Sequence, residues 1–159
     1  MARIRSPNYP QLSLSEAISR VKVIQEKERR AVAAKDVAMG HLGYRSLNGA
    51  SMAVLSALLK YGLLEEVNGK GVRVSETAMA ILHPGSAQEK ADAIRAAAGR
   101  PPLFAEIAQA FDGVEPSDAN LRSWLIRRNF ADDAAVRAIE TYRATMELVT
   151  RESGAYGPP

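Results

Sequence analysis

One short hairpin, in a chain whose other segments have helical periodicity, most constrains the fold. Two runs of aliphatic and β-branched residues, 63–67 and 72–74, flank the sequence NGKG at 68–71. Asparagine and glycine readily take the left-handed backbone conformations that a tight hairpin turn requires. We therefore predict a two-stranded antiparallel hairpin at this position.

The first helix is predicted to begin at Ser13. Ser13 and Glu16 have the spacing of a capping box, in which each side chain satisfies a free backbone amide of the other residue. From there to about residue 29, apolar residues recur every three or four positions, as on one face of an amphipathic helix. These apolar residues are Leu14, Ala17, Ile18, Val21 and Ile24.

Two further helices are predicted before the hairpin. One covers about 34–42 and ends at Gly43, where the chain needs a residue that tolerates positive φ. The other starts at Asn48-Gly49 and ends near residue 61, before Gly62. The residues expected to be buried by the second helix are Val37, Ala38 and Leu42. The residues expected to share one side of the third helix are Leu47, Val54, Leu58 and Tyr61.

The chain after the hairpin is predicted to be helical. Ser75 is positioned to cap a short helix that Pro84 halts. Longer helical segments, separated by breaks that contain proline or glycine, are expected at about 87–98, 103–111, 118–128 and 133–152. The last segment carries an apolar stripe formed by Val136, Ile139, Tyr142, Met146 and Val149.

Composition and charge narrow the possible functions. Because the 159 residues include no cysteine, disulfide frameworks, thiolate zinc sites and cysteine nucleophiles are excluded. Residues 1–74 carry 12 Lys and Arg against 6 Asp and Glu, whereas residues 75–159 carry 9 against 12. This division indicates that the basic half meets a polyanion; chance sorting of surface charge is the alternative. No apolar run has the length of a signal-peptide core or a membrane span, so we expect a cytoplasmic protein.

The order of these elements and two sequence motifs resemble a winged helix-turn-helix domain. The motifs are VAMGHLGY at 37–44, similar to the helix and glycine turn, and ALLKYGLL at 57–64, similar to a recognition helix that runs into the wing. The resemblance implies a mainly α (α+β) fold, similar to poorly characterised bacterial and phage winged-helix proteins with a C-terminal helical region. The expected parts are an extended basic arm at 1–12, the winged domain at 13–83, the C-terminal helical region at 84–153 and a disordered tail at 154–159.

The same resemblance implies DNA-binding residues, because the third helix of winged-helix proteins usually lies in the major groove. The candidates for contacts to bases are Asn48, Ser51, Met52 and Ser56. The candidates for contacts to phosphates are Arg45, Lys60, Lys70 and Arg73. Arg3 and Arg5 of the arm are candidates for the minor groove. The alternative is that Asn48 only caps the helix, that the two serines and the cations are ordinary solvated surface residues, and that the arm is disordered.

We therefore expect a non-enzymatic protein that binds double-stranded DNA, a transcriptional regulator acting as a homodimer through its C-terminal helices. It would be cytoplasmic, and nucleoid-associated when bound to DNA. Catalysis, metals and cofactors are not expected, because His41 and His83 have no partners at metal-ligand spacing and no phosphate-binding loop is present. Two alternatives stay open: a protein-interaction adaptor built on the winged fold, and a sequence-indifferent architectural DNA binder.

Overall fold

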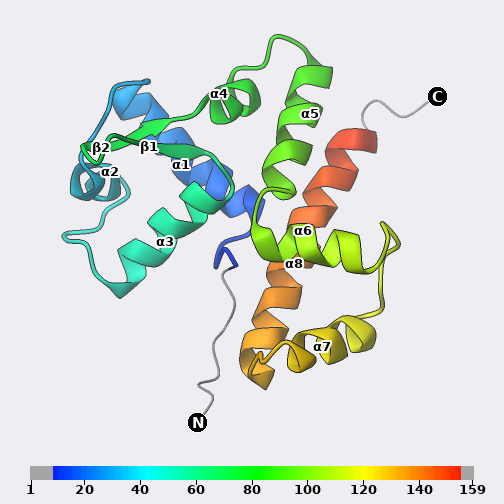
Figure 1. Cartoon of the computed structure of the whole chain (residues 1–159). Helices are drawn as coiled ribbons and strands as arrows, with labels where there is room; N and C mark the ends of the chain where they lie inside the picture. The colour runs from blue at the N-terminus through cyan, green and yellow to red at the C-terminus, as the bar shows by residue number, and fades with distance from the viewer. Residues whose placement is uncertain (1–8, 155–159) are drawn as a thin grey trace.

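The structure of the protein, a computed structural model, describes residues 9–154 (Figure 1). Within that range eight helices and one two-stranded antiparallel sheet form the regular structure, so the fold is mainly α with a small β element, as predicted. None of these helices combines the length and the apolar composition needed to cross a membrane. The elements are α1 (Leu14–Glu28), α2 (Lys35–His41), α3 (Gly49–Lys60), β1 (Leu64–Val67), β2 (Gly71–Val74), α4 (Glu76–Leu82), α5 (Ala87–Ala98), α6 (Pro102–Ala110), α7 (Asp118–Arg127) and α8 (Asp132–Gly154).

Short polar side chains cap the first turn of most of these helices. At α1 both bonds of the predicted capping box are present, because the Glu16 N–H donates to the Ser13 hydroxyl and the Glu16 carboxylate accepts from the Ser13 N–H. Ser75, Ser86 and Ser117 occupy the same position before α4, α5 and α7. These local signals explain why the predicted helix boundaries agree closely with the structure.

The predicted hairpin is confirmed, and a third segment extends it. β1 and β2 pair in antiparallel register with Val67 opposite Gly71. Ala33, between α1 and α2, forms an antiparallel bridge with Val72 through backbone hydrogen bonds of 2.8 and 2.9 Å. Gly71 permits this approach, because a Cβ atom there would overlap the Ala33 carbonyl oxygen. The bridge therefore fixes the loop before α2 against the turn end of the hairpin.

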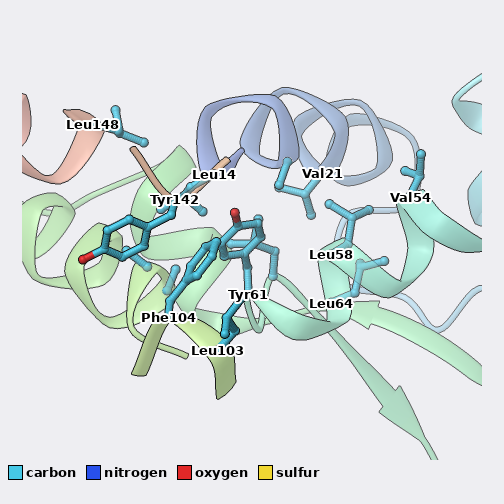
Figure 2. Close-up of a cluster of buried hydrophobic side chains, with 14 of the residues drawn as sticks. Leu14, Val21, Val54, Leu58, Tyr61, Leu64, Leu103, Phe104, Tyr142 and Leu148 are labelled. Carbon is cyan, nitrogen blue, oxygen red and sulfur yellow. The ribbon is translucent and has the colours of Figure 1, made fainter. Parts of the chain in front are cut away.

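One hydrophobic core runs through both the first three helices and the C-terminal helices. α8 packs against α1, α5 and α7, and α4 packs against α5 (Figure 1). Figure 2 shows Tyr61, directly after α3, beside Phe104 of α6. The rings of Tyr61, Phe104 and Tyr142 follow one another with centroid separations of 6.3 and 5.4 Å. The end of α3 is thus packed into the centre of the C-terminal helices.

A set of buried and partly buried hydrogen bonds, the Tyr61–Thr145 network, reinforces this junction. The Tyr61 hydroxyl donates to the Leu12 carbonyl oxygen at 2.8 Å and lies 3.0 Å from the Thr145 hydroxyl of α8. The Leu14 N–H donates to the same Thr145 oxygen at 3.1 Å. Because Leu12 takes the Tyr61 proton, the Thr145 hydroxyl donates to Tyr61. Burial raises the pKa of Tyr61 above its ordinary value, although the hydrogen bond from Thr145 opposes that shift.

Two apolar side chains that were predicted on buried faces are exposed instead. Val37 is 44% exposed, because the short helix α2 packs through the adjacent Ala38 and Met39. Leu47 is 41% exposed, because it precedes the N-cap residue Asn48 and so does not follow the helical period of α3. The first error assigned the wrong face to a short helix, and the second extended a helical pattern beyond the start of α3.

Candidate nucleic-acid interface

The exposed side of α3 carries a narrow stripe in which small side chains are interrupted by one methionine and end at one lysine. Its residues recur every three or four positions, so they lie on one face of the helix. Met52 is the one large apolar side chain on this stripe and is 44% exposed. Lys60 is the one charged residue in α3 and stands at its last position. The α3 stripe consists of Gly49, Met52, Ala53, Ser56 and Lys60.

Asn48 caps α3 and is exposed. Its Oδ1 atom accepts a hydrogen bond from the Ser51 N–H at 3.1 Å. Its Nδ2 amino group has no hydrogen-bond partner within the described part of the chain. The predicted cap is therefore present, and the side chain still has a free donor at the start of the stripe.

Ser51 is fully buried, so it is not available for the base contact that the sequence suggested. Its hydroxyl donates to the Ser46 carbonyl oxygen at 2.8 Å and accepts from the Asn48 N–H at 2.8 Å. These bonds complete a capping box at the start of α3. Ser51 therefore stabilises the turn before α3, and we remove it from the candidate interface.

Ser56 and Lys60 lie at the far end of the α3 stripe and bond to each other. The Lys60 Nζ atom donates to the Ser56 hydroxyl at 2.6 Å. Partial burial lowers the pKa of the Lys60 amine from its ordinary value. An ammonium group has three donors, so Lys60 keeps donors for a phosphate, and Ser56, which accepts this bond, keeps its hydroxyl proton as a donor.

The hairpin offers less positive charge than its sequence suggests. Arg73 lies opposite Glu65 and is ion-paired with it at 2.8 Å. Arg30 lies 3.6 Å from the same Glu65, and Lys35 lies 3.6 Å from Glu66. The cross-strand pair was predictable from the register of the hairpin, because directly opposed residues on antiparallel strands interact. Arg73 is therefore a weaker candidate for a phosphate contact than its position alone indicated.

Arg45 and Lys70 are the least neutralised of the predicted phosphate-binding residues. Arg45 lies in the turn before α3 and Lys70 in the hairpin turn; both are exposed, and neither has a carboxylate partner within residues 9–154. Arg3 and Arg5 lie outside the described residues. Four further cations, on α1 or directly after it, also lack an ion pair in the described range. They are Arg20, Lys22, Lys27 and Arg29.

The two histidines pair with polar side chains of α1. His41 Nε2 lies 2.6 Å from Glu28 Oε2, and His83 Nε2 lies 3.3 Å from Gln25 Oε1. The sequence did not predict the contact with Glu28, because that residue lies on another helix. Among residues 9–154, no group of three or more His, Cys, Asp or Glu side chains is arranged to hold a metal ion.

A shallow apolar groove of about 560 Å³ lies between α5, α6 and α8. Tyr142, Met146 and Val149, from the stripe predicted on α8, line this groove. Ile139 of the same stripe is buried in the core, whereas Val136 is 45% exposed. A second copy of the chain would therefore meet only part of the predicted stripe.

The surface around α3 thus combines a stripe of small side chains, one free amide donor at its start and cations in two neighbouring turns. Such a surface fits a groove lined by hydrogen-bond acceptors and flanked by phosphates. Comparison of the chain with family models, with curated proteins and with solved structures found no match.

Proposed function

We propose that the chain binds double-stranded DNA through a winged helix-turn-helix unit formed by α1, α2, α3 and the hairpin. The α3 stripe carries this proposal, because its small side chains allow close approach and the major groove is wide enough to admit a helix. The bridge between Ala33 and Val72 adds support, since it holds the hairpin at a fixed place beside the helices.

In the proposed complex α3 enters the major groove. Asn48 and Met52, both exposed near its start, face the edges of the bases. Arg45, Lys60 and Lys70 contact phosphates, which fixes the position of the helix without reading sequence. Arg3 and Arg5 stay predicted minor-groove contacts.

The proposal includes a role in transcriptional regulation as a homodimer, with the C-terminal helices joining the copies. Two copies would match the two half-sites of a symmetric operator. The exposed Val136 and the half-buried Met146 and Val149 supply apolar surface for this contact. Sedimentation equilibrium measures the assembly; a chain that stays monomeric and still binds DNA would remove the dimer from the proposal.

The test of DNA binding is fluorescence anisotropy with labelled duplex fragments of random sequence. Binding should weaken steeply between about 50 mM and about 200 mM salt, because phosphate contacts release counterions. Arg45→Gln and Lys70→Gln should each weaken binding and reduce the slope of log K against log salt by about one.

Arg127→Gln is the matched control, because Arg127 is an exposed cation on α7 whose side chain bonds only to Ser123 in the described range. This variant should bind DNA as the wild type does. An equal loss for Arg127→Gln, or no binding to any fragment at low salt, would contradict the proposal. Selection from the random pool then separates a sequence-specific regulator from an architectural binder.

A protein-interaction adaptor is the second candidate function. Three large apolar side chains near α2 and α3, Val37, Leu47 and Met52, are exposed. The pairing of Arg73 with Glu65 also leaves the hairpin less basic. This candidate predicts no DNA binding at low salt, and loss of co-purified protein on Val37→Ser and Leu47→Ser substitution. The adaptor function would be rejected if these two variants still co-purify with the same proteins and the wild-type chain binds DNA.

A further inference from the structure

We infer that α3 selects A·T base pairs through contacts with thymine methyl groups, an inference that rests on the proposed DNA binding. The start of a recognition helix is where side chains meet base edges. In this chain that surface carries apolar side chains and one amide donor. The exposed or half-exposed residues there are Leu47, Asn48, Ala50, Met52 and Ala53.

The helix lacks the side chains that usually read guanine. Arginine or lysine commonly recognises guanine, because their N–H groups bond to both O6 and N7. Residues 47–59 contain neither, and the amine of Lys60, at the last position of α3, donates to Ser56. The first three turns of α3 therefore offer no cationic donor that could favour a G·C pair.

The thymine C5 methyl is the apolar group that the unmodified major groove presents. Met52 and Leu47 are 44% and 41% exposed, so apolar surface is available to cover such a methyl group. A methionine side chain is flexible enough to adapt to the exact position of the methyl. Gly49 and Ala53, on the same stripe, leave room for the helix to come close.

Asn48 adds a contact that favours adenine over guanine. Its free Nδ2 group can donate to adenine N7, and its Oδ1 atom has a second lone pair for the adenine N6 amino group beside the bond from Ser51. Guanine presents two acceptors in that position, so Oδ1 would face O6 without a proton between them. The apolar contacts and the amide therefore select the same base pair.

The test removes single methyl groups from the DNA. Fragments bound by the full chain are selected from a random pool, and the recovered site is resynthesised with deoxyuridine in place of each thymine in turn. At thymines beneath α3, each replacement should weaken binding about fourfold, the equivalent of one buried methyl group. In the Met52→Ala variant, the methyl contact is already lost, so replacing the thymine that Met52 contacts in the wild type should weaken DNA binding almost no further.

Two further variants keep this test decisive. Ile126→Ala, at a similarly exposed apolar residue on α7, should show the full penalty for every uracil. Met52→Leu keeps an apolar side chain at this position, so its binding should still weaken when the thymine methyl group is removed. This result would show that the effect of Met52→Ala comes from the lost contact and not from misfolding. Uracil duplexes that bind as tightly as thymine duplexes, or selected sites rich in G·C beneath α3, overturn the inference and leave DNA binding intact. Failure of every fragment to bind at low salt overturns the proposed function as well.

Discussion

Replacement of Tyr61 by phenylalanine should lower the free energy of unfolding by about 2 kcal/mol. The substitution keeps the ring and its packing against Phe104 but removes the hydroxyl that bonds to Leu12 and Thr145. A net hydrogen bond is worth about 0.5–1.5 kcal/mol, and a buried acceptor left unpaired costs about 1–3 kcal/mol. The partly buried Leu12 carbonyl and the fully buried Thr145 hydroxyl both lose this partner, so the expected cost lies in the middle of the combined range.

Urea unfolding followed by circular dichroism measures this cost in the full chain. The matched control is Tyr142→Phe, because the Tyr142 hydroxyl has no hydrogen-bond partner within residues 9–154. The control should therefore cost less than Tyr61→Phe, although both variants remove one hydroxyl from an aromatic ring in the same cluster.

A double-mutant cycle with Thr145→Val tests whether the network acts as a unit. The Leu14 N–H and the Tyr61 hydroxyl both bond to Thr145, so the two single substitutions damage shared partners. We expect a coupling energy of about 1 kcal/mol between them. A cost below about 0.5 kcal/mol for Tyr61→Phe, or additive single substitutions, would refute the reasoning.

Three other expectations follow from the same structure. Ser51→Ala should cost about 1 kcal/mol in thermal unfolding, because the Asn48 N–H and the Ser46 carbonyl oxygen both lose the Ser51 hydroxyl, while Asn48 still caps α3; an unchanged melting temperature would argue against this role of the buried hydroxyl. Gly71→Ala should cost about 1–3 kcal/mol in urea unfolding through overlap with Ala33, whereas the same change at the exposed helical Gly40, which has no neighbouring atom within 4 Å and no positive φ, should not destabilise the chain. Above about pH 10, the unfolding free energy should fall as pH rises, because burial raises the pKa of Tyr61 and only the unfolded chain then releases that proton. Tyr61→Phe should show a shallower fall in alkaline urea titrations; an equally steep fall would assign the effect elsewhere.

Local signals in the sequence predicted most of the secondary structure. The Ser13 and Glu16 pair and the NGKG turn at 68–71 act within a few residues of the backbone that they shape, so both are confirmed. Ala33 was not predicted as part of the sheet, because a single bridged residue has no periodic pattern and its partner, Val72, is far away in the chain.

The candidate interface was harder to predict, because exposure and charge pairing depend on tertiary contacts. Asn48 and Ser51 are both polar residues at the start of α3, yet one is exposed and the other is fully buried. Arg73 is offset by Glu65 only because the hairpin register places them opposite each other. The sequence therefore predicted the α3 helix and its cap, but not which of the neighbouring side chains are exposed or ion-paired.

The Tyr61–Thr145 network has a consequence for how the chain can be divided. A fragment cut after residue 83 would lose Thr145 and Phe104, leaving the Tyr61 ring without its neighbour in α6. The Leu14 N–H would lose its acceptor at the same time. The smallest piece that keeps α3 in its present position must therefore include α8, so deletion mapping of the α3 surface would report unfolding instead of lost contacts.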